Sequence, residues 1–167
     1  LSLWYDRSSK QNLLQAIQLL EEADKLEPNY PDVLGLLAMC WATGTERNYF
    51  DFDTSQHRLF DYAERTLKLN PDHEHGLLAL GTYYFILKNY TLAHTYYTHA
   101  FDRAPDKGIT SQALGELALY TGRYAESLDH IKRAHKASPY DMSVRKHLSY
   151  TEMANGFPKA SKKICDE

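Results

Sequence analysis

Residues 71–105 read PDHEHGLLALGTYYFILKNYTLAHTYYTHAFDRAP, and this stretch decides the fold. Large and small residues recur in it at helical spacing. Small residues let two helix backbones approach closely, and large ones fill the space beside them. The stretch therefore predicts two helices, at 74–87 and 90–103, that pack along each other. The pattern reads Leu77-x2-Leu80-Gly81-x2-Tyr84 and then Ala93-x3-Tyr97-x2-Ala100.

Prolines recur through the chain at a fixed distance. Pro71, Pro105 and Pro139 are 34 residues apart, and Pro28 precedes Pro71 by one such period plus 9 residues. Proline ends a helix because its ring clashes with the preceding turn and it lacks a backbone N–H. An acidic residue follows each proline closely and favours the positive start of the next helix. The prolines therefore predict repeated helix pairs.

The next period repeats this arrangement with few changes. It keeps Leu114-Gly115, Ile131, Ala134 and Pro139 at the matching places. Together the two periods resemble the tetratricopeptide-repeat (TPR) signature, in which Leu-Gly and Tyr are followed by Ala, an aromatic residue, Ala and Pro. Ala118 and Ser127 depart from it, since Tyr and Ala are usual there. The resemblance implies an all-α fold, an α-solenoid of stacked antiparallel helix pairs (a TPR superhelix) with about four to four and a half repeats.

Residues 1–167 are expected to form one TPR domain. Its predicted parts are a partial first repeat (1–28), a repeat with an inserted loop at 42–53 (31–71), two complete repeats (74–105 and 108–139) and a partial or capping repeat (142–167). Residues 1–6 resemble the last turn of a helix that starts earlier, so we expect the chain to be cut from a longer protein. Helices are predicted over residues 9–26, 32–43, 54–69, 74–87, 90–103, 108–120, 124–137, 141–154 and 157–166.

Composition excludes several functional classes. Hydrophobic residues make up 43% and charged residues 25%, and the formal net charge is -3, so no basic surplus indicates binding to nucleic acid or to an anionic membrane surface. No apolar run approaches the length of a membrane helix. Cys40 and Cys165 lie far apart and form no Cys-x-x-Cys pair, which fits a reducing compartment. A cytoplasmic protein is expected.

The sequence offers little for catalysis or metal binding. Asp72-His73-Glu74-His75 is the densest group of potential metal ligands, but its histidines are two residues apart and diverge around a helix. We interpret the group as helix-start acids with exposed imidazoles. No metalloprotease, nucleophile or phosphate-loop motif is present. The chain is therefore predicted not to be an enzyme, and to have no cofactor and no metal.

Aromatic residues fall into two groups. Tyr84, Tyr90, Tyr97 and Tyr124 occupy recurring repeat positions and are predicted to pack between helices, whereas Tyr83, Tyr96, Tyr120 and Tyr150 are candidates for exposed contacts. The predicted loop at 42–53 holds three further aromatics and ends where Thr54 is expected to cap a helix. The three aromatics can fold back onto the edge of the solenoid or act as a docking loop. They are Tyr49, Phe50 and Phe52.

The resemblance also implies a binding groove. In TPR proteins the first helix of each pair lines a concave surface, and its ligand-facing positions are three and four residues apart, so they share one stripe. The surface so predicted is mostly apolar and lacks the Lys and Asn set with which TPR co-chaperones grip a carboxylate. It suits a helix or a hydrophobic segment. Its residues are Gly35, Met39, Ala42, His75, Leu78, Thr82, Phe85, Ile109, Gln112, Glu116, Leu119, Lys146, Tyr150 and Met153.

Residues 26–32, together with the lengthened first unit, look like TPR regions attached to bacterial regulators. In those proteins the array follows a winged-helix DNA-binding domain or an adenylate cyclase domain. This similarity implies a regulatory or sensory module in transcription regulation or signalling, one that binds a protein or peptide in its groove. The alternative is a structural array that associates with itself, as a homo-oligomer, and has no separate ligand.

Overall fold

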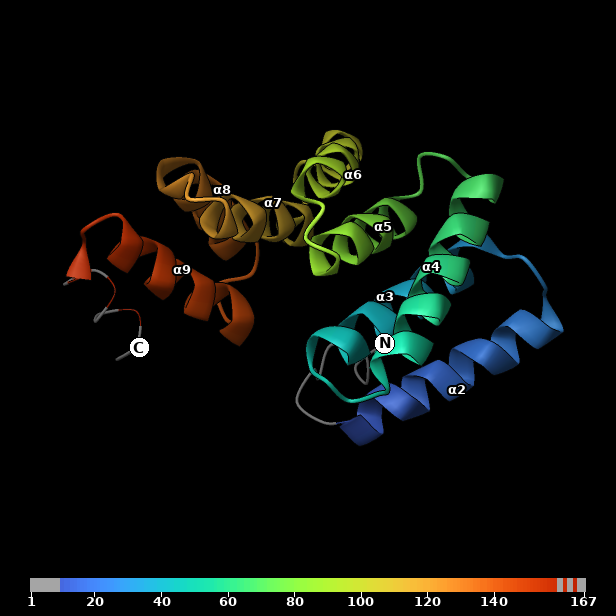
Figure 1. Ribbon diagram of the computed structural model, residues 1–167. Coiled ribbons are helices and arrows are strands. Elements are labelled where there is room, and N and C mark those ends of the chain that lie inside the picture. The colour runs from blue at the N-terminus through green and yellow to red at the C-terminus, as the bar shows by residue number, and fades with distance from the viewer. Residues whose placement is uncertain (1–9, 159–160, 162–163, 165–167) are drawn as a thin grey trace. The chain divides into compact units, whose positions relative to one another are not determined.

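The computed structural model describes residues 10–158, 161 and 164. In that part of the chain there are helices and no strands, which confirms the all-α prediction (Figure 1). The predicted turn at 1–6, most of the helix predicted at 157–166, and Cys165 lie outside the described residues. The helices are α2 (Lys10–Leu26), α3 (Pro31–Glu46), α4 (Phe52–Leu69), α5 (Glu74–Ile86), α6 (Tyr90–Arg103), α7 (Gly108–Tyr120), α8 (Tyr124–Ala137) and α9 (Met142–Ala154).

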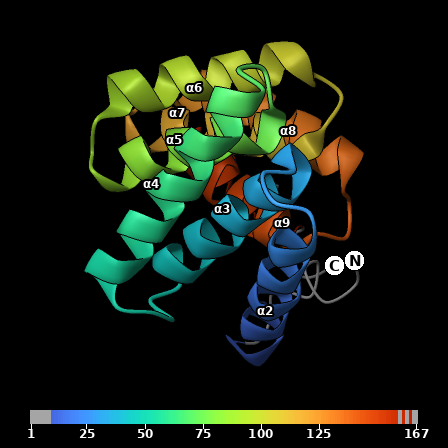
Figure 2. The ribbon, with the colours of Figure 1, turned by 90° about the vertical axis from the view of Figure 1, so that its right-hand side faces the viewer.

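The chain divides into two compact units, the first ending at Tyr96 and the second starting at Tyr97, inside α6. In the first unit α3 lies between α2 and α4, and α5 packs against both α3 and α4 (Figure 2). Its centre is aliphatic, because the inward face of each helix carries leucine. Leu34, Leu37 and Leu59 are fully buried there. Burying each such side chain contributes about 1.5–3 kcal/mol before entropy costs.

The second unit is built around the pair α7 and α8, with α9 packed mainly against α8. Gly115 brings the pair together, since a Cβ there would lie 2.6 Å from Cδ1 of Ile131. Ser127, at a place where TPR proteins usually have alanine, is fully buried and donates a 2.7 Å hydrogen bond to the Gly115 carbonyl. The departure from the signature is therefore compensated, because a buried hydroxyl without a partner would be costly.

The connection between α3 and α4 differs from the sequence prediction. Residues 42–53 were predicted to form a loop, but α3 runs to Glu46 and α4 begins at Phe52. Gly44 favours a loop by propensity, yet inside α3 it leaves room for the ring of Phe50. The helix cap is also different, because Asp51 accepts hydrogen bonds from the backbone N–H and the hydroxyl of Thr54. Most of the extra residues therefore lengthen helices, since tertiary packing overrides local propensity.

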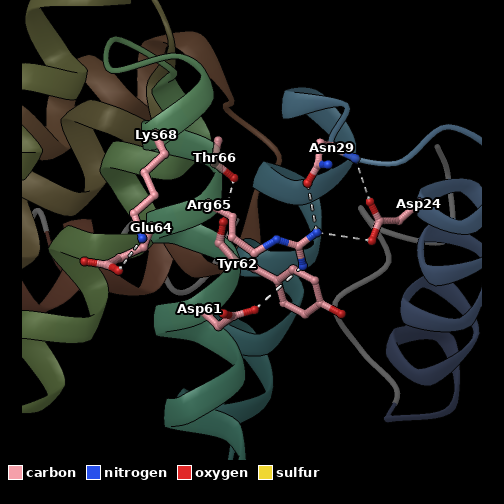
Figure 3. Close-up of polar contacts among 8 residues, drawn as sticks. All are labelled: Asp24, Asn29, Asp61, Tyr62, Glu64, Arg65, Thr66 and Lys68. Carbon is pink, nitrogen blue, oxygen red and sulfur yellow. Dashed lines mark hydrogen bonds and ion pairs between the residues drawn. The ribbon is translucent and has the colours of Figure 1, made fainter.

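One arginine joins three parts of the first unit (Figure 3). The Arg65 guanidinium, on α4, lies 3.5 Å from the Asp24 carboxylate of α2 and donates to Oδ1 of Asn29 at 3.3 Å. Asn29 forms the turn before α3 with a φ of 64°, and its backbone N–H bonds to Asp24. The planar guanidinium can serve several acceptors at once. Arg65 thus holds the end of α2 and the following turn against α4.

The turns between paired helices place different residue types in the left-handed region. Gly122 and Gly156 have φ values of 78° and 81°, in the left-handed region. In the turn of Lys88 and Asn89, however, it is Lys88 that has the positive φ, at 59°. Asn89 instead caps α6, its side-chain oxygen accepting from the backbone N–H of Leu92 at 3.2 Å. A side-chain cap satisfies an otherwise unpaired helix donor, and this favours asparagine at that place.

Candidate protein-binding surface

In the first unit, the residues predicted to line a groove are largely enclosed. Met39, Leu78 and Thr82 are each less than a tenth exposed, and Ala42 and Gly35 are buried as well. His75 and Phe85 are half-buried. Leu78, at 2% exposure, offers almost nothing to a partner. These side chains therefore act chiefly in packing.

A buried histidine joins α3 to α5 in the same unit. His73 is only 8% exposed, so the expectation of an exposed imidazole is wrong for this residue. Its Nδ1 accepts from the backbone N–H of Gly76 and caps α5, which leaves the proton on Nε2. Nε2–H donates to Oδ1 of Asp32 at 2.9 Å, and this hydrogen bond lowers the pKa of Asp32. Gly35 leaves room for the imidazole, since a Cβ there would lie 2.7 Å from Cε1 of His73.

The same histidine belongs to the group considered as metal ligands. His73 and His75 have ring centroids 5.8 Å apart. Among the residues that the structure describes, no three His, Cys, Asp or Glu side chains gather in a way that could hold a metal ion. In the structure His73 caps α5 and links it to α3 through Asp32.

In the second unit, predicted groove residues meet across α7 and α9. Gln112 donates to Oε1 of Glu116 at 2.7 Å and to the hydroxyl of Ser143 at 3.1 Å. Nδ1 of His147 lies 3.0 Å from Oε1 of Glu116, in an orientation that makes no hydrogen bond. Burial lowers the pKa of His147, and the charge of Lys146 lowers it further. A polar seam thus links the two helices.

Beside this seam, α9 and the residues just after it present an exposed face, which we call the α9 stripe. It consists of Met142, Lys146, Tyr150 and Met153, which are three or four residues apart on α9 and so share one side of it, and of Phe157, which follows the turn at Gly156. Tyr150, Met153 and Phe157 are 50%, 58% and 53% exposed. The ammonium of Lys146 lies over the Tyr150 ring, 5.7 Å from its centroid. Four of the five side chains are large and apolar, although they are open to solvent.

Sequence reasoning found part of this surface. It singled out Lys146, Tyr150 and Met153, and it missed Met142 and Phe157 at the two ends. A signal was available for Met142, which continues the same helical spacing. Phe157 gave none, because it follows the end of α9 and the turn at Gly156. Of the other predicted residues in this unit, Gln112 is buried, while Ile109, Glu116 and Leu119 on α7 are half-buried.

The aromatics near the α3–α4 turn do not act as one group. Phe50 folds back onto α3, its ring centroid 4.9 Å from that of Trp41, and it fills the space beside Gly44. Tyr49 is half-buried, whereas Phe52 opens α4 and is half exposed. Phe50 therefore folds back onto the helices, which is one of the two predicted alternatives. A docking role for this segment remains a prediction.

The tyrosines also divide differently from the prediction. Tyr83, Tyr84 and Tyr96 join Phe60 in a continuous aromatic row over α4, α5 and α6, with Tyr84 and Tyr96 stacked 5.5 Å apart. Tyr83 and Tyr96, expected to be exposed, are thus half-buried packing residues. As predicted, Tyr97 is buried and Tyr90 packs, here on Phe85, while Tyr120 and Tyr150 are exposed. Tyr124, expected to pack, is 45% exposed.

Comparison with solved structures decides the fold type. The chain matches TTC0263, a thermophilic TPR protein of Thermus thermophilus, with a TM-score of 0.69 and 17% identity over 90% of this chain and 80% of that one. The chain has the TPR fold. MamA of Desulfovibrio magneticus RS-1 matches with a TM-score of 0.63 and 18% identity, over 93% of this chain and 82% of MamA.

A third TPR-type match is to a larger assembly. The APC/C hetero-tetramer Cut9–Hcn1 matches with a TM-score of 0.72 and 12% identity, over 92% of this chain and 29% of that one. No family model and no curated protein matches the sequence. At these identities the likeness concerns the TPR fold alone. None of the described helices is both long enough and apolar enough to cross a membrane.

Proposed function

We propose that this chain is a protein-binding module without catalytic activity, and that the α9 stripe is its docking surface. The observation that carries the proposal is the exposure of Met142, Tyr150 and Met153 along one face of α9, with the exposed Phe157 just after it. Large apolar side chains gathered on one exposed face are typical of interaction sites. The TPR fold supports the same interpretation, because the first helices of successive repeats supply its binding surfaces.

The chemistry of the stripe favours the apolar face of a helix or a hydrophobic peptide as partner. Met142 and Met153 are flexible and can adapt to different shapes, while Tyr150 provides a rigid ring with a polar end. Lys146 adds one positive charge for an acidic residue at the edge of the partner. Each anchor that becomes buried would contribute about 1.5–3 kcal/mol before ordering costs, which corresponds to micromolar binding for two or three anchors.

Peptide selection tests this proposal even though the partner is unidentified. Peptides selected by display on the immobilised chain are expected to carry apolar residues at helical spacing and to bind in the micromolar range. Tyr150→Glu should weaken their binding at least about ten-fold, because a charge would then face an apolar contact. Affinities are measured by fluorescence anisotropy.

The matched control is Tyr140→Glu, the same substitution at a tyrosine that is 92% exposed and lies outside the stripe. Its affinity should stay within about two-fold of that of the unmodified chain. Peptides that bind all three proteins equally would show that the α9 stripe is not the site. Leu78→Glu and Phe85→Glu are less suitable, since Leu78 is buried and a charge there would disturb the fold.

A second copy of the chain is the alternative occupant of the stripe. An exposed apolar face can pair with itself as readily as with another protein. Sedimentation velocity separates the two functions: self-association gives a mass that rises with concentration and falls back in Tyr150→Glu. A monomer that binds the selected peptides supports the protein-binding function instead.

We also propose that the module belongs to a larger cytoplasmic regulator of bacterial type. Support comes from residues 26–32 and from the long first unit, in which α3 and α4 contain 16 and 18 residues. The same reading frame is then expected to encode a winged-helix or adenylate cyclase domain before this chain. Sequencing of the gene checks this, and a different type of neighbouring domain would contradict the assignment.

A further inference from the structure

The three methionines of the chain differ sharply in their access to solvent. Met142 and Met153 are 73% and 58% exposed, whereas Met39, on α3, is 9% exposed. Both exposed methionines belong to the α9 stripe, where they are the first residue of α9 and the last but one. They are 11 residues apart, about three helical turns, so they lie on the same face. Both readily accessible methionines of the chain are therefore part of the proposed docking surface.

Access to solvent decides which of these sulfurs an oxidant can reach. A thioether needs no ionisation to react, because its lone pair attacks an oxygen of the peroxide directly. An S–O bond forms as the O–O bond breaks, so the sulfur is oxidised to the sulfoxide and hydrogen peroxide is reduced to water. The side chains around Met39 keep the oxidant away from its sulfur. Oxidation should therefore select Met142 and Met153.

The sulfoxide would change what the α9 stripe offers to a partner. Methionine is flexible and apolar, whereas its sulfoxide is polar and carries an oxygen that accepts hydrogen bonds. The two sulfurs lie on either side of Lys146 and Tyr150 along the stripe. An apolar partner that covers them would remove water from both sulfoxide oxygens and supply no donor in return, which disfavours docking. The fold itself should not suffer, because neither side chain fills the interior.

We propose that Met142 and Met153 form a reversible oxidation site, at which a peroxide converts both side chains to sulfoxides and thereby releases the partner from the α9 stripe. The effect on binding rests on the proposed function, whereas the selective oxidation does not. Thiols supply the electrons for the reverse step, as in methionine sulfoxide reductases. Two thiols become a disulfide, the sulfoxide oxygen leaves as water, and the thioether is restored.

The first experiment treats the folded full chain with hydrogen peroxide and follows each methionine by peptide mass spectrometry. Met142 and Met153 are expected to form sulfoxide at least about ten-fold faster than Met39. The same treatment in concentrated urea is the control, because unfolding exposes all three sulfurs and should bring their rates within about two-fold of one another. Equal rates for the three methionines in the folded chain would overturn the oxidation site.

The second experiment measures how tightly the display-selected peptides bind before and after the chain is oxidised. Peptides free of methionine and cysteine are used, and the peroxide is removed before they are added. Dithiothreitol then restores oxidised cysteine, Cys165 included, and leaves the sulfoxides in place. The affinity is expected to fall at least about ten-fold and to recover after treatment with sulfoxide reductases for both epimers. Helix content, measured by circular dichroism, should stay the same throughout.

Matched variants assign the effect to the two sulfurs of α9. Leucine has a similar volume and no sulfur to oxidise. In the double variant Met142→Leu, Met153→Leu, the affinity after peroxide should stay within about two-fold of the value that the same variant has before it. Met39→Leu should still lose about ten-fold, as the unmodified chain does. An equal loss in the double variant would place the oxidised residue elsewhere and overturn the proposal.

The docking surface and the oxidation site fail in different measurements. Equal peptide binding by Tyr150→Glu and by the unmodified chain would show that the α9 stripe is not the docking surface. Equal peroxide rates at Met39, Met142 and Met153 would show that the stripe is not the oxidation site. Selective oxidation that leaves the affinity unchanged would overturn the release of the partner, whether or not Tyr150→Glu weakens binding.

Discussion

The two units use matching helices in different ways. In the first unit α5 encloses its predicted groove residues, with Leu78 at 2% exposure, whereas in the second unit α9 leaves Met153 at 58%. Both residues lie on the first helix of a repeat and were chosen by the same transfer from the TPR pattern. A repeat position thus fixes the direction in which a side chain points. It does not fix whether a neighbour covers that side chain.

The largest expected effect follows from this contrast. Leu78→Ala should lower the free energy of unfolding by about 2–5 kcal/mol, because it removes buried methyl groups and leaves a cavity. Met153→Ala should change it by less than about 0.5 kcal/mol, as is usual for exposed positions. Urea denaturation of each variant measures both values. Equal losses would show that α5 and α9 are covered to the same degree.

A smaller effect is expected where helices approach most closely. Gly115→Ala should cost about 1–3 kcal/mol, since the new methyl group would meet the Ile131 side chain at 2.6 Å. Adding Ile131→Val removes the Cδ1 atom and should recover part of this loss. Thermal unfolding of the single and double variants gives the coupling. If the double variant is no more stable than Gly115→Ala, the strain lies in the backbone and not in the contact with the Ile131 side chain.

The corresponding substitution in the first unit is Gly35→Ala. There the methyl group would meet the His73 imidazole, which is held by Asp32. In addition to a similar loss of stability, the pKa of Asp32 should return towards its ordinary value as the hydrogen bond weakens. An NMR titration of the Asp32 carboxyl checks this, and an unchanged pKa would mean that His73 moves together with its partner.

The smallest effect concerns pH, and it again separates the units. Burial lowers the pKa of both His130 and His147 in the second unit. Between these lowered values and the unfolded value of about 6.5, the unfolded chain binds more protons. The free energy of unfolding of the second unit should therefore fall as pH drops through about 6.5. His147→Gln should make this dependence on pH less steep, and the contribution of His130 should remain.

The lowered pKa of Asp32 in the first unit acts in a different range. Stability from a carboxylate with a depressed pKa is complete above the unfolded value of about 3.9 and is lost only as pH falls below it. Hydrogen exchange of amides in α8 and α3, measured between pH 7 and pH 5, compares the two units directly. Exchange protection in α8 should fall over this range and protection in α3 should not. An equal loss of protection in both helices would contradict the prediction.

Much of the helical framework could be predicted because its rules are local or periodic. Pro71, Pro105 and Pro139 end helices by steric exclusion, and the small residues Gly115 and Ala134 are buried, as predicted. The length of α3 could not be predicted, because Gly44 favours a loop until Phe50 packs beside it. Only tertiary contact decides between the two outcomes.

The candidate sites were less predictable for a related reason. His73 lies in a group of polar residues that looks solvated, and only the approach of Asp32 and Gly35 shows that it is enclosed. The polar contact between α7 and α9 combines residues from two helices, with Gln112 and Ser143 separated by 31 positions. Neither contact has a sequence motif, so the sequence contained no signal for it.

The hydrogen bond between Ser127 and the Gly115 carbonyl has one more consequence. Aliphatic side chains would allow two packed helices to slide along each other by a fraction of a turn at little cost. A hydroxyl bonded to one particular carbonyl resists such sliding, because this hydrogen bond is lost when the axial offset changes. Serine in place of alanine therefore defines a single alignment for this helix pair.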